Sequence, residues 1–592
     1  MSARAQHRPL RWGVVDVLGW SVADFKSIGS ASVDLSRGHL SILTGANSAG
    51  KSSLLQSILM MCQSVNDGSG IVLNGPLVRL GVPRDIVRSG AETCSIAIDY
   101  RIPAARPTKG GDDDRPMDVR GTVVFHATED SGTGDDVQAL RIGSASLRLP
   151  DGTVVDVSDD VAPKDSDRLI NDLIVHGQAL DNGREGVAVY RMSVRGAEDS
   201  AYVILEGADA MAVVKEMDQR TAYENFLSEL EAFAVDGEGL PSMRYRHAIL
   251  SELEARRRPE DLPHAWHASP GKLDGLLSRL SLEERRGIAR GAASRLSEGA
   301  PRSVASSTRG LSRGQVREQL RWHEWLVDPA LAVFGLLEAF REVAQRVAYI
   351  GPLRDDPRVI SPLADGAIGN LPIGAKGERA ASVLLSTHRR WKRYGFPGES
   401  KLREASMGDA VNEWARYLGV AREVSALNMH NLGVGLTVSS GEEGDLDLTR
   451  VGVGVSQAIP ILVGVLSAPA QSIVIIEQPE LHLHPSAQAK LADFLLYARR
   501  DVTFLIETHS EALVTRIRRR VVEGSRGADT ISILFFEDDG DGSGVVSRRL
   551  AVNRYGNLNE WPKGFMDAVQ EDSRLIMRAA AEMRREERGR HD

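Results

Sequence analysis

The stretch Gly45-Ala46-Asn47-Ser48-Ala49-Gly50-Lys51-Ser52 decides the fold. It matches the phosphate-loop pattern, in which two glycines separated by four residues are followed by a lysine and a hydroxyl residue. A β-type run at residues 40–44 precedes it, and residues 51–65 have helical periodicity with no Gly or Pro. In that context backbone N–H groups curl around phosphates, Lys51 reaches the outer phosphates and Ser52 binds Mg²⁺. A chance glycine-rich turn is the alternative, and the order strand, loop, helix argues against it.

The second informative stretch is Ser472-Ile473-Val474-Ile475-Ile476-Glu477-Gln478-Pro479-Glu480. Four apolar residues run into an acidic residue, which is typical of a central parallel strand that ends in a carboxylate. We predict that Glu477 meets the Mg²⁺ held by Ser52. Taken alone, the stretch is better explained as a buried strand that ends in a surface acid, but the phosphate loop upstream favours the functional interpretation.

Two further stretches carry candidate phosphate contacts. Val451-Gly452-Val453-Gly454-Val455-Ser456-Gln457 lies just ahead of a predicted helix, so its glycines and serine could bind a phosphate there. An ordinary N-cap at Ser456 is an equally good explanation. Phe504-Leu505-Ile506-Glu507-Thr508-His509-Ser510 reads as a buried strand with a polar end, where His509 can sense a terminal phosphate. Its alternative is a capped helix start at Thr508 or Ser510.

Composition limits the classes of protein. The 592 residues leave room for about three to five domains, and a charged fraction of 26% is ordinary for a globular protein. A net charge of −9 argues against coating nucleic acid by bulk charge but allows a local basic groove. The two cysteines cannot build a disulfide framework or a Cys-rich zinc site. With no evident signal peptide or membrane span, we expect a cytoplasmic protein without membrane contact.

Together the four stretches resemble the ABC-class ATPases, in the group that contains the SMC, RecF and OLD-type proteins. Lys51 and Ser52 match Walker A, Glu477 matches Walker B, and residues 452–457 and His509 match the signature loop and the H-loop. Residues 479–485 match the stretch that holds the D-loop. Four further segments resemble a bacterial subgroup with an uncharacterised C-terminal domain: residues 25–27, 349–354, 374–378 and 561–567. The resemblance covers residues 20–90 and 345–570, whereas residues 91–344 match no family that we can name.

The resemblance implies ATP and Mg²⁺ as cofactors and a mechanism in which two heads sandwich two ATP molecules. Each ATP touches Walker A of one protomer and the signature loop of the other. Gly454, Ser456 and Gln457 would therefore act on the nucleotide of a partner, in a homodimer or higher homo-oligomer. The residues implied in binding ATP within the chain are Asn47, Ser48, Ala49, Gly50, Lys51, Ser52 and Ser53.

One departure from the family concerns hydrolysis. Gln478 stands where most ABC ATPases place a catalytic glutamate, and an amide is a poor base. A glutamine can still orient a water, as it does in small GTPases. Glu480 could supply a carboxylate if the loop brings it round. We therefore assign catalytic roles to Glu477, Gln478, Glu480 and His509, and we expect ATP binding more firmly than fast turnover.

The predicted fold is α/β: an ABC-type ATPase head split by a β-rich and then helical insertion, with a small C-terminal α+β segment. Five segments follow: residues 1–90 with Walker A, 91–205 as a β-rich lobe, 206–345 as a helical insertion, 346–535 with the other ATPase motifs, and 536–592. Within the insertion we expect helices at residues 210–235, 241–258, 272–296 and 315–347. Near the C-terminus we expect a hairpin from residues 530–536 and 544–550.

Three other features have functional alternatives. His482 and His484 lack the companions of a metal site, so structural or dimer-contact roles are favoured. The acidic residues 537–542 resemble part of a Toprim nuclease, but a solvated hairpin turn explains them better and we predict no intrinsic nuclease. The basic run at residues 516–520 could contact nucleic-acid phosphates, and a solvated helical face explains it at least as well.

The function that these expectations favour is an ATP-binding and hydrolysing switch that dimerises on ATP. By resemblance it would control DNA binding or a partner effector, such as a nuclease, in defence against phage or foreign DNA. One alternative is a DNA-repair or chromosome-maintenance ATPase that binds DNA directly. Another is a slowly or non-hydrolysing ATP-gated scaffold, in which Gln478 keeps the site closed.

Overall fold

The computed structural model describes residues 15–67, 71–103, 116–129, 138–159, 161, 187–195, 200–206, 209–216, 281–296, 303–307, 324–361, 373–439, 444–540, 542–562, 565 and 568–589. The chain divides into two compact units. Unit 1 comprises residues 1–14, 102–121 and 142–337, and unit 2 comprises residues 15–101, 122–141 and 338–592. The stretches with candidate site residues all lie in unit 2.

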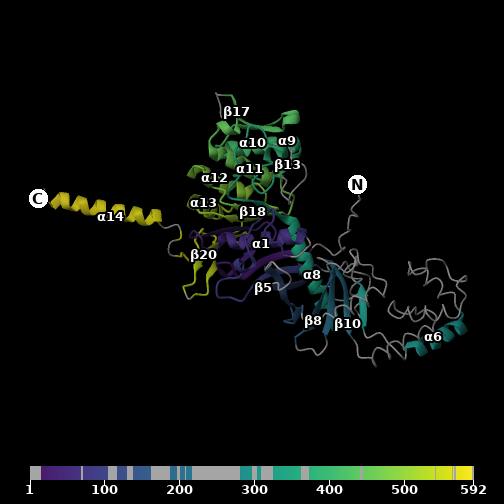
Figure 1. The fold of residues 1–592 in the computed structure, drawn as a ribbon. Helices are drawn as coiled ribbons and strands as arrows, with labels where there is room; N and C mark the ends of the chain where they lie inside the picture. Colours follow the sequence, from purple (N-terminus) through teal and green to yellow (C-terminus); the bar gives the residue numbers. More distant parts are fainter. Residues whose placement is uncertain are drawn as a thin grey trace. The chain divides into compact units, whose positions relative to one another are not determined.

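The sheet of unit 2 is organised around the strand that precedes the phosphate loop (Figure 1). Its strands follow the order β4 (Thr93–Ile102), β1 (Asp16–Phe25), β2 (Ile28–Asp34), β21 (Val545–Leu550), β20 (Ile531–Asp538), β3 (Leu40–Gly45), β19 (Thr503–Glu507), β18 (Ile473–Glu477) and β12 (Val347–Ile350). The run from β20 to β12 is parallel throughout. Strands β3, β18 and β19 are almost continuously apolar and buried, as parallel strands covered on both faces must be.

Helices cover the parallel strands of unit 2. Helix α1 (Lys51–Asp67) contacts β1, β2 and β3. The other helices of unit 2 are α9 (Ala380–Thr387), α10 (Met407–Leu418), α11 (Val453–Ser467), α12 (Pro485–Tyr497), α13 (Glu511–Val522) and α14 (Ala568–Gly589). Short 3-10 turns lie at η1 (Pro83–Asp85), η5 (His430–Leu432), η6 (Leu448–Arg450) and η7 (Ala528–Thr530). Two small sheets complete the unit: β13 (Trp391–Tyr394) with β14 (Arg403–Ser406), and β15 (Glu423–Asn428), β16 (Val434–Ser439) and β17 (Asp445–Asp447).

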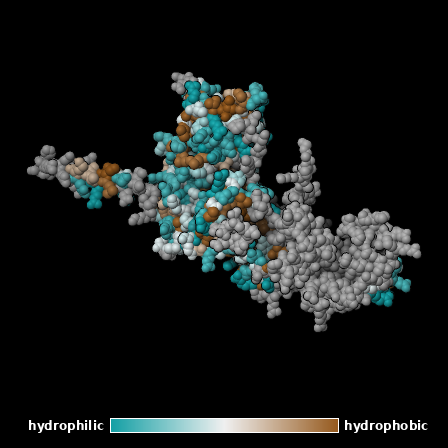
Figure 2. Space-filling model, viewed as in Figure 1, coloured by the Kyte–Doolittle hydropathy of each residue, from teal (hydrophilic) through white to brown (hydrophobic). Residues whose placement is uncertain are grey.

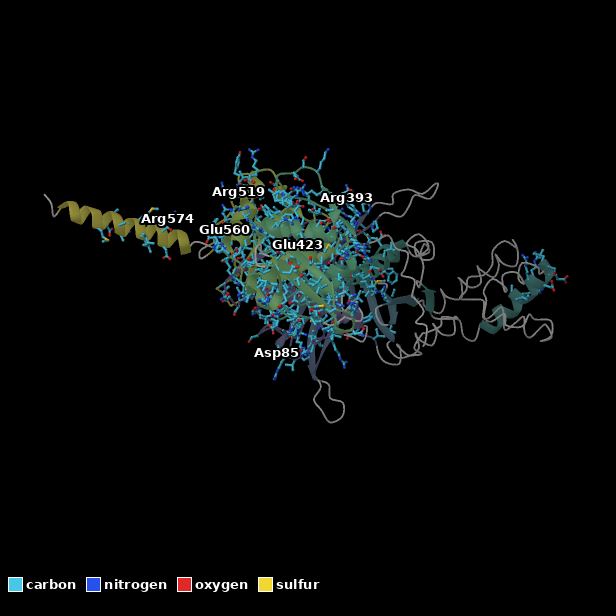
Figure 3. The ribbon with its side chains drawn as sticks, turned by 90° about the horizontal axis from the view of Figure 1, so that it is seen from above. Asp85, Arg393, Glu423, Arg519, Glu560 and Arg574 are labelled. Carbon is cyan, nitrogen blue, oxygen red and sulfur yellow. The ribbon has the colours of Figure 1, made fainter. Side chains whose placement is uncertain are left out.

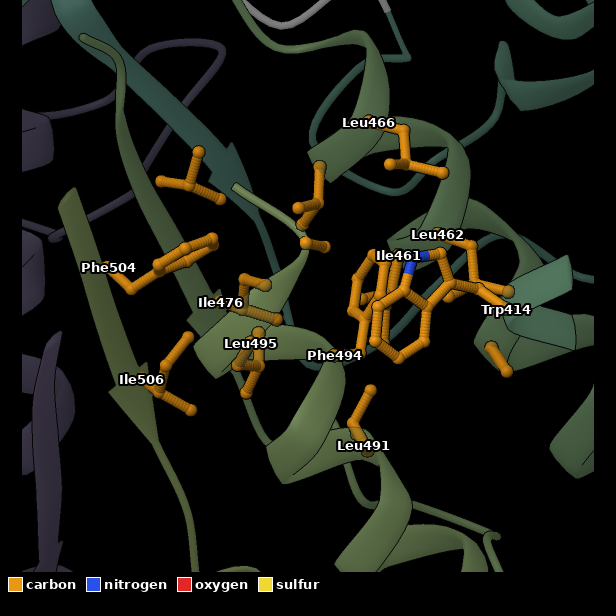
Figure 4. Packing of buried hydrophobic residues seen from close by; sticks show 14 of the residues in the cluster. Trp414, Ile461, Leu462, Leu466, Ile476, Leu491, Phe494, Leu495, Phe504 and Ile506 are labelled. Atoms are coloured by element: carbon orange, nitrogen blue, oxygen red, sulfur yellow. The ribbon is translucent and has the colours of Figure 1, made fainter. Parts of the chain in front are cut away.

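The main core of unit 2 lies between the parallel strands and the helices α9 to α13. Trp414 of α10 is fully buried and meets Phe494 of α12 edge to face, with ring centroids 5.0 Å apart. Figure 4 shows these two rings beside Ile461 and Leu462 of α11, with Ile476 and Phe504 of the sheet opposite. Burying aromatic and aliphatic side chains of this size supplies the main drive for packing the helices onto the sheet.

Unit 1 is described mainly as antiparallel strands. They are β7 (Val154–Ser158), β8 (Val187–Val194), β9 (Ser200–Glu206), β10 (Asp209–Glu216) and β11 (Ser303–Ser307), each paired with the next. Helix α6 (Leu282–Leu296) also belongs to this unit. Strands β5 (Met117–Glu129) and β6 (Gln138–Arg148) and helix α8 (Glu324–Arg346) have residues in both units.

The α/β fold predicted from the sequence is confirmed, with one error in the insertion. The helix expected from residue 210 is wrong at its start, because Asp209–Glu216 forms strand β10 between β9 and β11. The run Ala210-Met211-Ala212-Val213-Val214 is apolar on both faces, and periodicity alone cannot separate such a run from a buried helix. The expected helix at residues 241–258 lies outside the described residues, and the division into five segments stays a prediction.

Other expected elements are present with shifted ends. The helices expected at residues 272–296 and 315–347 are described as α6 and α8. The hairpin expected from residues 530–536 and 544–550 is confirmed as the antiparallel pair of β20 and β21. Among the described residues, no helix has the length and apolarity that crossing a membrane requires. Figure 2 shows a mostly polar surface on unit 2, with apolar groups along α14 and near β13 and β17.

Candidate nucleotide site

The phosphate loop begins where β3 ends and finishes at the first residue of α1. Gly45 has a φ of +141°, and a Cβ there would lie 2.4 Å from the carbonyl oxygen of Phe536 in β20. Only glycine fits so close to a neighbouring strand in this conformation. Ser48 has a φ of +61°, in the left-handed region that costs a non-glycine residue free energy. The loop therefore turns sharply and presents exposed Ala46, Asn47 and Ser48 beside the N-terminus of α1.

Lys51 is folded back over its own loop. Its Nζ donates to the carbonyl oxygens of Gly45, at 3.2 Å, and Ala46, at 2.7 Å. Only 3% of Lys51 is exposed, and this burial lowers its pKa, while the charge of Glu507 acts in the opposite sense. A buried ammonium held only by carbonyl oxygens is arranged to exchange them for a more strongly charged anion.

Two glutamates close the site at the carboxyl edge of the sheet. Strands β18 and β19 end in register at Glu477 and Glu507, so both carboxylates leave the same edge. The hydroxyl of Ser52 lies 3.0 Å and 2.9 Å from the two carboxylate oxygens of Glu507. Glu477 accepts a hydrogen bond of 2.7 Å from the Tyr349 hydroxyl. The structure thus brings Ser52 against Glu507, which the sequence analysis quoted without a role, and sets Glu477 one strand further away.

Burial governs the charge of the acidic side chains. Burial, followed by the charge of Glu507, raises the pKa of Glu477 to about 7. Burial also raises the pKa of Glu507 and of Glu480 above their ordinary values. Carboxylates and hydroxyls are the oxygen ligands that Mg²⁺ prefers, usually one or two carboxylates together with phosphate oxygens. No group of three His, Cys, Asp or Glu residues among the described residues can hold a metal by itself, so the fit depends on Ser52 and on phosphate.

The turn after Glu477 is held by Arg354, another residue that the sequence analysis gave no role. The Arg354 guanidinium donates to the carbonyl oxygens of Glu477 and Gln478, each at 3.0 Å. Gln478 has a φ of +44°, so this turn is strained as well as clamped. Glu480 does not point freely into the site, because its carboxylate accepts the backbone N–H of His509 at 2.7 Å. Glu480 therefore has a structural role that competes with its predicted role as a substitute base.

His509 and the following helix start fit both of the alternatives considered for them. Ser510 is the N-cap of α13 and accepts the backbone N–H of Leu513, as the structural alternative predicts. The His509 side chain remains exposed, and partial burial followed by the charge of Lys51 lowers its pKa. The imidazole is therefore near enough to Lys51 for the charge of Lys51 to act on it.

The signature-like residues make their contacts away from the phosphate loop, within α11 and with the segment that carries His482. Gly452 is the N-cap of α11, so the idea that Ser456 caps the helix is wrong; Ser456 lies inside it and donates to the Val453 carbonyl at 2.8 Å. A Cβ on Gly454 would lie 2.5 Å from the carbonyl oxygen of His482. Within the described residues, no hydrogen bond joins Gly454, Ser456 or Gln457 to residues 45–53.

The other features noted in the sequence have structural partners. Arg516 and Arg520 of the basic run pair with the fully buried Asp493, and Arg518 donates to the Gly556 carbonyl. Arg519 is 60% exposed, and among the described residues its ion pair is with Glu523 four residues later, on the outside of α13 (Figure 3). His484 is the N-cap of α12. Most of the basic run is therefore used within the fold.

Comparisons with known proteins agree with an ATPase domain. Residues 306–515 match the family described as "AAA domain, putative AbiEii toxin, Type IV TA system", and residues 528–574 match a protein family of unknown function, DUF3696. The first match includes Glu477, Glu507 and His509 but not the phosphate loop. No curated protein matches the sequence. The α/β fold and the AAA match together support a nucleotide-binding ATPase.

Solved structures with similarity to this chain include SMC head domains. The head of Pyrococcus furiosus Smc, bound to the C-terminal domain of ScpA, is 9% identical with a TM-score of 0.31, over 91% of this chain and 96% of that one. The SMC head of Thermotoga maritima is 6% identical with a TM-score of 0.28, over 90% and 99%. The Smc head of Pyrococcus yayanosii is 12% identical with a TM-score of 0.29, over 91% and 98%.

Proposed function

We propose that the protein is an ATP-binding and hydrolysing switch, in which Lys51 and Ser52 bind the phosphates and the Mg²⁺ of ATP. The observation that carries this is the position of the loop between β3 and α1, with Ser52 facing an acidic edge of the sheet. Bound Mg²⁺ would neutralise charge on the phosphates. The chain itself supplies the loop N–H groups, Lys51 as a cationic contact, and Glu477 as an acidic ligand. His509, near Lys51, would contact the outermost phosphate.

We propose slow turnover. Gln478 has no basic carboxylate, and Glu480 is engaged with the His509 backbone, so neither is free to take a proton from water. Gln478 can orient the water by hydrogen bonding instead. These two observations favour a long-lived ATP-bound state and keep the ATP-gated scaffold as the second candidate.

We further propose that ATP joins two copies of the chain. Gly454, Ser456 and Gln457 would meet the phosphates bound by the partner's loop, and the absence of hydrogen bonds from them to residues 45–53 in the described part of the chain supports this. The nearby Val453 is 51% exposed, so a partner could reach this end of α11. Control of DNA or of an effector such as a nuclease, in defence against phage or foreign DNA, is the finer proposal. The toxin–antitoxin wording of the matched family supports it.

Phosphate release by the purified protein tests the proposal, with and without duplex DNA. Lys51→Ala is expected to abolish both nucleotide binding and turnover, because the phosphates lose their cationic contact. Turnover that survives in Lys51→Ala would place hydrolysis elsewhere. ATP binding without phosphate release in the wild type would instead favour the scaffold.

A direct DNA-binding role needs a different variant. Neutralising residues 516–520 together would also break the pairs with Asp493, so a loss of DNA stimulation could reflect unfolding. Arg519→Ala changes only an exposed arginine and is the cleaner probe (Figure 3). If DNA stimulates turnover and Arg519→Ala weakens this stimulation, the DNA-repair alternative is supported. Equal stimulation of the two proteins would show that Arg519 makes no important contact with DNA.

A further inference from the structure

The order of strands places Glu507 nearer to the phosphate loop than Glu477. Strand β19 pairs with β3 on one side and with β18 on the other, so it separates the Glu477 strand from the phosphate-loop strand. Ile506 lies opposite Ile42, and Glu507 lies opposite Leu43, two residues before the phosphate loop begins at Gly45. A cation bound to Ser52 would therefore meet the end of β19 before the end of β18.

The contacts agree with this order. Both carboxylate oxygens of Glu507 lie within 3.0 Å of the Ser52 hydroxyl, whereas one oxygen of Glu477 already accepts from Tyr349. A hydroxyl donates one hydrogen, so two nearly equal distances mean that the carboxylate faces Ser52 squarely. A hydroxyl oxygen and a carboxylate that lie side by side provide the oxygen ligands that a hard divalent cation prefers.

The charges of the two carboxylates also favour a positive partner. Glu477 is 7% exposed and Glu507 is 4% exposed, and they end neighbouring strands in register. Two buried carboxylates side by side repel each other, and a buried charge without a partner is strongly unfavourable. The two nearby cations already have partners: the Lys51 Nζ donates to loop carbonyls, and the Arg354 guanidinium donates to the carbonyl oxygens of Glu477 and Gln478. A divalent cation between the two strand ends would compensate both carboxylates at once.

We propose that Glu507 is a second acidic residue of the cation site and positions Mg²⁺ together with Ser52 and Glu477. This inference rests on the proposed function, since it assigns a residue to the same nucleotide site. Glu507 acts here as a positioning residue for the cation and its bound water, and Gln478 keeps the role of orienting the attacking water.

The test measures how Mg²⁺ supports binding of a fluorescent ATP analogue, first with a chelator present and then over a Mg²⁺ titration. Glu507→Gln keeps the shape of the side chain and removes its charge. We expect its Mg²⁺ midpoint to rise by about 10-fold or more, as for other groups that orient a bound metal. Binding without Mg²⁺ should be unchanged or tighter, because a negative charge near the phosphates is gone.

Glu511→Gln is the matched control, because it removes the same charge from the first turn of α13, four residues away. Its Mg²⁺ curve should coincide with that of the wild type. If Glu507→Gln does not fold, Glu507→Asp answers the same question, since withdrawing the carboxylate by one methylene should also raise the midpoint. An unmoved midpoint in the folded Glu507 variant, with the wild type binding normally, overturns the role of Glu507 alone. A wild type that binds no nucleotide in either condition overturns the proposed function with it.

Discussion

Gly454 is restricted by its own chain before any partner is considered. Its missing side chain makes room for the His482 carbonyl, and a Cβ would lie 2.5 Å from that oxygen. Gly454→Ala must therefore push two backbone segments apart, and we expect a loss of about 1–3 kcal/mol in the free energy of unfolding, as for other overpacked positions. Urea unfolding followed by circular dichroism measures this.

Ser456→Ala is the control for that prediction. Its hydroxyl bonds only within its own helical turn, to the Val453 carbonyl, so the loss should be less than about 1 kcal/mol. Of the two, Ser456→Ala is therefore the better variant for testing contact with a partner's nucleotide. Equal stability of the two variants would show that the loop carrying His482 moves aside at little cost.

His39 supplies a pH-dependent contribution to stability. Its ring is buried just before β3 and lies 3.0 Å from the Ser532 hydroxyl of β20. Burial lowers its pKa; Asp34 and Asp529 act to raise it, and Arg549 and Arg526 lower it further. Because the folded state binds the proton less readily than the unfolded state, stability is lost as the pH falls below about 6.5.

Thermal unfolding at pH 7.5 and at pH 5.5 checks the sign. The wild type is expected to lose more stability on acidification than His39→Gln, by at most about 1.4 kcal/mol per pH unit for a single proton. The raised pKa values of the site glutamates act in the opposite sense but are common to both proteins. A larger loss in His39→Gln than in the wild type would contradict the prediction.

At the scale of elements, Asp493 joins three helices. This fully buried carboxylate of α12 accepts from Tyr417 of α10 and from Arg516 and Arg520 of α13. Asp493→Asn keeps the shape but removes the buried anion from both guanidinium groups, and Arg520 then has only its surface partner Glu523. We expect a loss of about 3 kcal/mol in the free energy of unfolding, near the lower end for a broken buried pair because both arginines are partly exposed.

Glu523→Gln tests the same arginines from the outside. Glu523 pairs with Arg519 and Arg520 on the surface of α13, where an ion pair contributes little. Its loss should be less than about 1 kcal/mol. If both variants unfolded at the same urea concentration, the buried network would not be what holds α13 against α12.

Elements with a single clear period were predictable from the sequence. The runs ending at Glu477 and Glu507 are short, apolar and bounded by turn residues, and both are strands of the predicted kind. Strand β10 was mistaken for a helix because its apolar run has no alternation that favours either structure. The partners of a strand cannot be seen in its own residues; they are set by non-local pairing such as that of β12 with β18.

The same limit explains what was missed in the site. Phosphate-loop residues are contiguous, so Lys51 and Ser52 could be named from spacing alone. Tyr349 and Arg354 lie more than a hundred residues before Glu477 and reach it only because β12 is the neighbour of β18. Glu507 had a signal that was available, since it ends a buried strand as Glu477 does. Only the position of β19 between β3 and β18 shows which glutamate faces Ser52.

For the molecule as a whole, the chain returns to its beginning to complete the sheet of unit 2. Strand β20, within the stretch matched by the DUF3696 family, pairs with β3, and β21 pairs with β2. A chain that stopped before residue 528 would leave these strands with bare, apolar edges. Such edges pair with strands from other molecules. Light scattering by a chain shortened in this way should therefore reveal aggregates. We therefore expect the C-terminal hairpin to protect the sheet of unit 2 from self-association.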